Sequence, residues 1–207
     1  MNGPKLLLAT NNKGKAREYA RLLEGIPFVL VTPSDMNITA DVKETGETFE
    51  ENAILKATTL SAASGLPALA DDSGLEVDAL HGEPGVYSAR YAGEKASDSQ
   101  RVNFLLKKLR QVPEGMRQAR FRCVIAIALP GGRVELTSGE CDGVIALEPR
   151  GDKGFGYDPV FFIPELNKTM AELPPDVKNR ISHRARAAEK AKVLLEQIAA
   201  EEAESLD

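Results

Sequence analysis

An acidic pair that directly follows an apolar run constrains this chain more than any other feature of its sequence. Residues 66–70 form a short, mostly apolar run, and Asp71 and Asp72 come immediately after it. Such runs are typical of buried strands. Because burying a carboxylate without compensation costs several kcal/mol, we expect this strand to end at the pair and deliver it to a cleft.

The acidic pair has two interpretations when it is taken alone. Mg²⁺ prefers hard oxygen ligands and usually takes one or two carboxylates, with water and phosphate oxygens completing its shell. However, Asp71-Asp72-Ser73-Gly74 is also good turn chemistry, since Asp and Ser bond nearby backbone and Gly tolerates positive φ. Both readings stay open at this point.

Composition narrows the class of protein. With 207 residues, 43% hydrophobic and 28% charged, the chain can bury a full core as one domain or two closely joined lobes. A net charge of −5 argues against non-specific nucleic-acid binding. The two cysteines, Cys123 and Cys141, are too few for a disulfide scaffold, which fits a reducing cytoplasm. The apolar segment near the N-terminus is too short for a signal peptide or a membrane span, so we expect no membrane association.

A candidate phosphate cradle lies near the N-terminus. Residues 5–9 predict a buried strand, and residues 15–23 have apolar side chains at helical spacing. The segment between them contains Thr10, Asn11, Asn12, Lys13, Gly14 and Lys15. A strand-to-helix junction with free N–H groups and two lysines suits a phosphate, although an ordinary helix start with solvated lysines explains the same residues. The Walker pattern is absent.

The next segments predict further regular structure. Residues 28–31 indicate a strand. Thr48 and Glu51 have capping-box spacing for a helix that Gly65 can end. Asn52 and Lys56 share one face of that helix, and a solvated face is the usual explanation.

The second half of the chain predicts a sheet with surrounding helices. The irregular loop 81–91 is a candidate for a site or an interface. Ser97 and Gln100 predict a capped helix through residue 109. Residues 121–129 and 134–137 predict a hairpin, and runs 143–147 and 160–163 predict two more short strands. The expected fold is α/β, a mixed sheet flanked by helices.

Two C-terminal segments carry candidate ligand groups. Phe155 lies between glycines, where its ring could stack on a planar ligand or fold into the core. Lys178, Ser182, His183 and Arg184 precede or begin a long helix with an apolar stripe. Cations at a helix N-terminus oppose its dipole, and an anionic or carbonyl-rich ligand would remove that penalty.

In order and spacing these motifs closely resemble those of the house-cleaning inosine/xanthosine triphosphate pyrophosphatase family. The first motif matches T-x-N-x-x-K, with Asn11 where many members have Gly. The following segments match almost end to end: 44–46, Phe49 with 51–53, 70–74, 84–90, 154–158 and 181–184. Each motif is weak alone, but the set is highly specific.

The resemblance implies an elongated α/β fold of two lobes within one domain spanning residues 1–207, with the active site in the cleft between the lobes. It also implies a cytoplasmic homodimer that uses Mg²⁺ to hydrolyse ITP, dITP and XTP to the monophosphate and pyrophosphate. Asp72 would be the general base and, with Glu44, a metal ligand. The implied substrate-binding residues are Thr10, Asn11, Asn12, Lys13, Gly14, Lys15, Lys56, Ser73, Phe155, Gly156, Tyr157, Asp158, Lys178, His183 and Arg184.

General chemistry agrees with these roles, because phosphoryl-type transfer needs positioning, charge neutralisation and a base to orient water. Mutual repulsion would raise the pKa values of adjacent aspartates, and Mg²⁺ would lower them. Two other classes fit some of the residues. A nucleotide sensor would bind without turnover, and a two-carboxylate glycosidase using Asp72 and Glu44 would need neither metal nor lysines.

Overall fold

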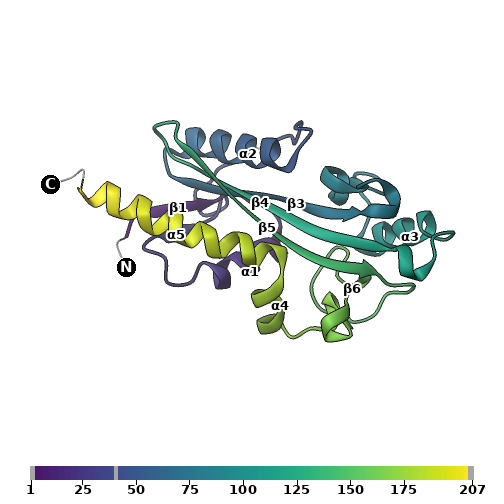
Figure 1. Cartoon of the computed structure of the whole chain (residues 1–207). Coiled ribbons are helices and arrows are strands. Elements are labelled where there is room, and N and C mark those ends of the chain that lie inside the picture. Colours follow the sequence, from purple (N-terminus) through teal and green to yellow (C-terminus); the bar gives the residue numbers. More distant parts are fainter. Residues whose placement is uncertain (1–2, 40–41, 205–207) are drawn as a thin grey trace. The chain divides into compact units, whose positions relative to one another are not determined.

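The computed structural model describes residues 3–39 and 42–204 (Figure 1). The chain forms two compact units. The first unit comprises Met1–Asp72, Cys123–Gly139 and Ala185–Asp207, and the second comprises Ser73–Arg122 and Glu140–Arg184. Three strands and the last helix contain residues of both units.

A seven-stranded sheet has the order β2-β1-β3-β4-β5-β6-β7. β1 pairs in parallel with β2 and β3, whereas β6 pairs antiparallel with β5 and β7, so the predicted mixed sheet is confirmed. The strands are β1 (Lys5–Leu8), β2 (Val29–Val31), β3 (Ala68–Val77), β4 (Gln118–Ala128), β5 (Val134–Ile145), β6 (Phe161–Ile163) and β7 (Lys168–Thr169). The predicted hairpin corresponds to β4 and β5, and the separate strand expected at 143–147 is instead the end of β5.

The acidic pair lies inside a strand, so the prediction that the strand ends before it is wrong. β3 begins at Ala68 and continues through both aspartates to Val77, with most of its residues buried. The turn interpretation of the Asp-Asp-Ser-Gly segment is excluded by the same observation. Lysines from other elements form ion pairs with the two carboxylates, as described below. Because their charges are compensated, both aspartates can lie inside a buried strand.

Two helix layers cover the sheet of the first unit (Figure 1). α1 (Lys13–Leu22) and α5 (His183–Glu204) lie on one face, and α2 (Phe49–Ser64) lies on the other. Side chains of α1 and α5 share a core with Leu6, Leu69 and Cys123. Successive strand residues point to opposite faces, so β3 residues in phase with Leu69 face α1.

The second unit has its own core and shorter helices. Its buried residues include Leu75, Leu105, Phe121, Tyr157 and Phe161. Its two α-helices are α3 (Asp98–Lys108) and α4 (Pro175–Ile181). Five short 3₁₀ segments cover Asp78–Leu80, Gly85–Arg90, Glu114–Met116, Pro164–Leu166 and Met170–Glu172.

Helix ends follow the local sequence signals closely. The Thr48 hydroxyl accepts from Glu51 N at 3.1 Å, and Gly65 ends α2 in the left-handed conformation. Glu51 completes this cap one residue earlier than expected, because its carboxylate accepts from Glu47 N at 2.7 Å. The capping box of Ser97 and Gln100 forms at the start of α3 as predicted.

None of the helices described between residues 3 and 204 is both long enough and apolar enough to span a bilayer.

Candidate active site

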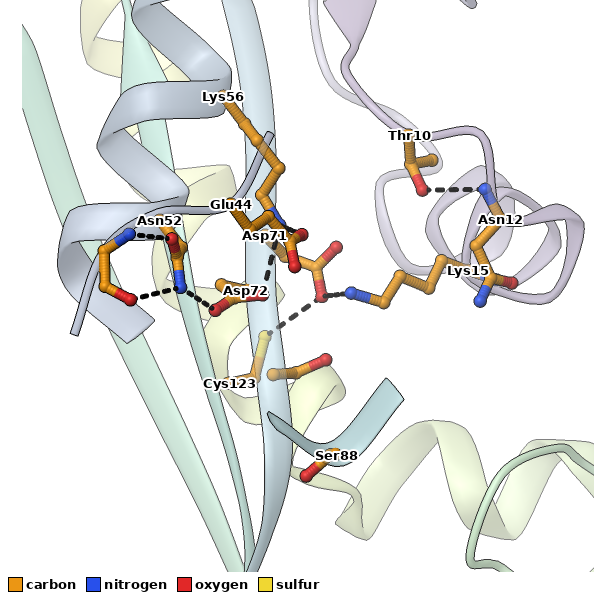
Figure 2. A network of polar contacts seen from close by, with 12 residues as sticks. Thr10, Asn12, Lys15, Glu44, Asn52, Lys56, Asp71, Asp72, Ser88 and Cys123 are labelled. Carbon is orange, nitrogen blue, oxygen red and sulfur yellow. Dashed lines mark hydrogen bonds and ion pairs between the residues drawn. The ribbon is translucent and has the colours of Figure 1, made fainter. Parts of the chain in front are cut away.

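The two adjacent aspartates serve opposite faces of the sheet. Asp71 is in phase with Leu69 and lies on the α1 face, where its Oδ2 is 2.9 Å from Lys15 Nζ. Asp72 lies on the α2 face, where it meets Asn52 and Lys56 (Figure 2). The alternation of a strand therefore turns the two carboxylates to opposite faces, although the charge of Asp71 still acts on Lys56.

The Asp72 cluster consists of Glu44, Asn52, Lys56 and Asp72. Lys56 Nζ donates to Glu44 Oε1 at 2.7 Å and to Asp72 Oδ1 at 3.1 Å. Asn52 Nδ2 donates to the other carboxylate oxygen, Asp72 Oδ2, at 3.2 Å. Lys56 and Asn52 do share one face of α2, as predicted, but that face is turned to Asp72 rather than to solvent, and Asn52 is buried.

Gly46 fixes the orientation of the Asn52 amide. Gly46 N donates to Asn52 Oδ1 at 2.8 Å, and Asn52 Nδ2 donates to Gly46 O at 3.3 Å. The amide oxygen is thereby assigned, and the NH₂ group must point to Asp72. A Cβ at Gly46 would lie 2.8 Å from Asn52 Oδ1, so this close approach requires glycine.

Burial and charge set the protonation of the Asp72 cluster. Burial raises the pKa of Asp72 above its ordinary value, with Lys56 opposing this shift and Glu44 adding to it. Burial acts to lower the pKa of Lys56, but the charges of Asp72, Asp71 and Glu44 outweigh it, and the pKa of Lys56 is raised. Lys56 therefore stays charged at neutral pH and balances two carboxylates.

The donor set of the Asp72 cluster fits a divalent cation. Across residues 3–39 and 42–204, no group of three or more His, Cys, Asp and Glu side chains is arranged to hold a metal ion. Glu44 and Asp72 nevertheless converge on one cationic atom, Lys56 Nζ. One or two carboxylates are what Mg²⁺ commonly takes from a protein, so these two residues fit that ion.

The predicted phosphate cradle comprises residues 10–12, which precede α1, and the first residues of that helix, which begins at Lys13. Asn12 is the N-cap, and its side chain accepts from Gly14 N at 2.8 Å and Lys15 N at 3.1 Å. Thr10 Oγ1 accepts from Asn12 N at 3.1 Å. Asn11 and Lys13 are exposed. Lys15 alone among these residues reaches back to the sheet, where it pairs with Asp71 (Figure 2).

In the second unit, Asp158 organises the loop of residues 154–158. Asp158 Oδ2 accepts from Phe155 N at 2.9 Å and from Lys178 Nζ, on α4, at 2.5 Å. Gly154 has φ +77°, and a Cβ there would lie 2.0 Å from Asp158 Oδ2, so the site requires glycine. The Asp158 side chain therefore fixes the backbone of the loop and holds the Lys178 ammonium beside it.

Cations surround the ring of Phe155. Lys178 Nζ lies 4.9 Å and Arg184 Cζ 5.5 Å from the ring centroid. Arg184 is buried and donates from Nη2 to Ser73 Oγ at 2.9 Å. Phe155 therefore lies beside cations and is not folded into the core of the second unit.

Two further predicted site residues, His183 and Tyr157, make contacts within the second unit. The His183 ring stacks on Phe121, with centroids 4.7 Å apart. The Tyr157 hydroxyl donates to Ser88 O at 2.9 Å, and burial raises the pKa of Tyr157.

Asp98 and Asn52 are contributors that sequence reasoning missed. Asp98 Oδ2 accepts from Gly156 N at 2.6 Å, which ties the loop to the first turn of α3. No local signal marks that contact, because the residues are distant in sequence. For Asn52, the shared helix face with Lys56 was a usable signal.

Comparison with known proteins identifies the family. The model of the Ham1 family matches residues 6–194. A dITP/XTP pyrophosphatase of Geobacter sulfurreducens is 56% identical over 183 residues, covering 88% of this chain and 92% of that protein. A second, from Desulforamulus reducens, is 52% identical over 194 residues, covering 94% and 96%.

A solved structure gives the same result for the fold. A HAM1 protein from Coxiella burnetii superposes with a TM-score of 0.86 at 42% identity, covering 94% of this chain and 99% of that one. The predicted resemblance to the inosine/xanthosine triphosphate pyrophosphatases is confirmed, and the chain belongs to the Ham1 family.

Proposed function

We propose that this protein hydrolyses the purine nucleoside triphosphates dITP, ITP and XTP to the monophosphate and pyrophosphate, and so removes them from the nucleotide pool. The observation that carries the proposal is the Asp72 cluster, in which a buried carboxylate is held between an ammonium and a fixed amide. The names of the relatives, dITP/XTP pyrophosphatase, supply the substrate class.

Asp72 is the proposed general base. Its carboxylate accepts from Asn52 and Lys56, and these contacts fix the orientation of the group that is proposed to take a proton from the attacking water. Burial raises the pKa of Asp72, and Mg²⁺, when bound, would lower it and keep the carboxylate ionised so that it can accept a proton. Water is then added across the anhydride bond between the α and β phosphates, and pyrophosphate leaves.

Glu44 and Asp72 are the proposed ligands of Mg²⁺. When bound, this ion would neutralise phosphate charge and polarise the bond that breaks. Lys56 contacts both carboxylates and is the proposed cationic partner of the triphosphate in this cluster.

The remaining predicted site residues divide between phosphate and base. Thr10, Asn12 and Lys15, with residues 11, 13 and 14, are proposed to bind the triphosphate at the start of α1. Phe155 is proposed to stack on the purine, with Lys178, His183 and Arg184 nearby. From the same family resemblance we propose a cytoplasmic homodimer.

The decisive test is release of pyrophosphate from dITP, ITP, XTP, GTP and ATP in molar excess over enzyme. We expect steady release from the first three, loss of activity with EDTA and recovery with excess Mg²⁺. Binding without turnover would instead indicate a nucleotide sensor, and release of orthophosphate would mean that a different bond is cleaved. Activity that survives EDTA would remove the metal from the mechanism.

Lys15→Ala is expected to weaken binding of dITP about tenfold or more and binding of the product dIMP about twofold or less. Lys15 lies in the first turn of α1, where its ammonium and the positive end of the helix dipole favour the charged phosphate tail. KM for dITP and the inhibition constant of dIMP measure the two effects. Equal losses of affinity for dITP and dIMP would show that Lys15 does not contact the β and γ phosphates.

A further inference from the structure

We propose that Asp71 is a positioning residue for Lys15 and does not belong to the metal site. The inference rests on the proposed function, because it concerns the lysine that is assigned to the triphosphate. Asp71 and Asp72 would then have different roles on opposite faces of one strand.

The geometry of β3 separates Asp71 from the proposed metal ligands. Asp71 and Asp72 are consecutive residues of a regular strand, so their side chains leave it in opposite directions. Asp72 faces α2 and Glu44 reaches the same ammonium, whereas the Asp71 carboxylate faces α1 (Figure 2). The charge of Asp71 acts on Lys56, but the carboxylate forms its ion pair with Lys15 and not with Lys56.

The surroundings of Asp71 hold its carboxylate against Lys15. Asp71 Oδ2 is 2.9 Å from Lys15 Nζ, and the Asp71 side chain is only 1% exposed while that of Lys15 is 16% exposed. Cys123 Sγ on β4 lies 3.8 Å from the same oxygen, and Tyr19 Oη lies 3.7 Å from Cys123 Sγ. The Asp71 carboxylate is therefore held by neighbours inside the protein, and part of the Lys15 side chain remains accessible to solvent.

Pairing with Asp71 prepares Lys15 for an anion in two ways. A free lysine loses much rotamer freedom when it binds a ligand, and an ion pair formed on folding removes part of that cost from the binding step. An ammonium has three N–H donors, so a single partner leaves others for phosphate oxygens. The negative charge of Asp71 acts in the opposite direction, since it weakens the attraction of Lys15 for an anion.

The ordering effect should exceed this repulsion because the Asp71 carboxylate is almost fully buried and fixed in place, whereas part of the Lys15 side chain stays accessible. Asp71→Asn keeps the volume but loses the charge, so Lys15 would no longer be held. We expect KM for dITP to rise about tenfold and kcat to change less than about threefold, as for loss of one charge-assisted contact. A lower KM would mean that repulsion dominates, and it would overturn the proposal.

A double-variant cycle separates positioning from a general structural role. In the Lys15→Ala background, Asp71→Asn should have a much smaller effect on KM, because the residue that Asp71 pairs with is absent and only its weaker effect on Lys56 is left. Lys15→Ala alone should lower Tm, since a buried carboxylate loses its cation, and the double variant should recover part of that loss. If Asp71→Asn raises KM equally in both backgrounds, Asp71 does not act through Lys15. If the single Asp71→Asn variant folds poorly, the double variant compared with Lys15→Ala still decides between these outcomes.

Asp78→Asn is the matched control. Asp78 follows the same strand and forms an exposed ion pair with Arg120 at 2.9 Å, so its removal costs one Asp–Arg contact without touching Lys15. KM and Tm should stay close to wild type. Failure of the wild type to hydrolyse dITP would overturn the proposed function together with the phosphate role of Lys15. An active wild type with unchanged KM in Asp71→Asn would overturn the positioning role alone.

Discussion

Asp72→Asn is expected to lower kcat for dITP by about 10²–10⁴-fold, the range that a general base contributes, while the protein stays folded. Asparagine has nearly the same volume and cannot accept a proton from water at neutral pH. The variant also removes the charge that Asp72 would offer to Mg²⁺, so the loss should lie toward the upper end of that range.

Two opposing effects on stability should nearly cancel in this variant. One oxygen of Asp72 accepts from Lys56 and the other from Asn52, so the NH₂ group of an introduced asparagine must face a donor. That mismatch costs about 1–3 kcal/mol. Burial of the Asp72 charge is itself unfavourable, as its raised pKa indicates, and the substitution relieves it. We therefore expect only a small change in Tm.

The measurements are steady-state pyrophosphate release and thermal unfolding. Asn52→Ala serves as a graded comparison, because it removes one contact to Asp72 but keeps the carboxylate, and its kcat should be intermediate. An Asp72→Asn variant with near-normal turnover and Tm would exclude Asp72 as the base.

Local signals predicted the secondary structure where the causes are local. The caps at Thr48 and Ser97 and the left-handed Gly65 depend on residues within one turn, and the structure has all three. The course of β3 through the acidic pair was not predictable in this way. It depends on Lys15 and Lys56, which other segments bring to the strand.

The same distinction applies to the candidate site. The family resemblance selected Glu44, Lys56 and Asp72, whereas the local pattern alone gave a solvated face for Lys56, and the structure brings these three together. The division of Asp71 from Asp72 follows from simple strand alternation, but only once both residues are known to lie inside the strand. The tie between Asp98 and Gly156 joins distant segments and has no local pattern.

Arg184→Ala is expected to reduce the ratio of kcat/KM for dITP to that for ATP by about tenfold or more. Hypoxanthine carries an oxygen acceptor at C6, where adenine carries an amino donor. A guanidinium only donates hydrogen bonds, so Arg184 favours the C6 oxygen of hypoxanthine. With adenine, two donors would face each other. Such a mismatch costs about 1–3 kcal/mol, and two or three of them give roughly 10²–10⁴-fold selectivity in the wild type.

The position of Arg184 supports this role. Its guanidinium lies 5.5 Å from the Phe155 ring centroid and donates to Ser73 Oγ at 2.9 Å. The nearby Lys178 donates to Asp158 at 2.5 Å, which engages one of its donors. Arg184 is therefore the donor-rich side chain beside the proposed stacking ring, and its bond to Ser73 holds it there.

Arg117→Ala is the matched control, because a buried arginine can be needed for folding alone. Arg117 belongs to the same unit, and its guanidinium donates to Val112 O at 3.0 Å and to Leu109 O at 2.9 Å. Both variants should lower Tm, but only Arg184→Ala should change the ratio of kcat/KM for dITP to that for ATP.

GTP provides the second control for Arg184, since its C6 also carries an oxygen. The ratio of kcat/KM for dITP to that for GTP should change less than about twofold in Arg184→Ala, because both substrates lose the same contact. The experiment is kcat/KM for dITP, XTP, GTP and ATP with wild type and both arginine variants. If the dITP-to-ATP ratio survives Arg184→Ala, or falls as much in Arg117→Ala, base selection must be assigned to another residue. If the dITP-to-GTP ratio changes as much as the ratio to ATP, Arg184 reads a group other than the C6 substituent.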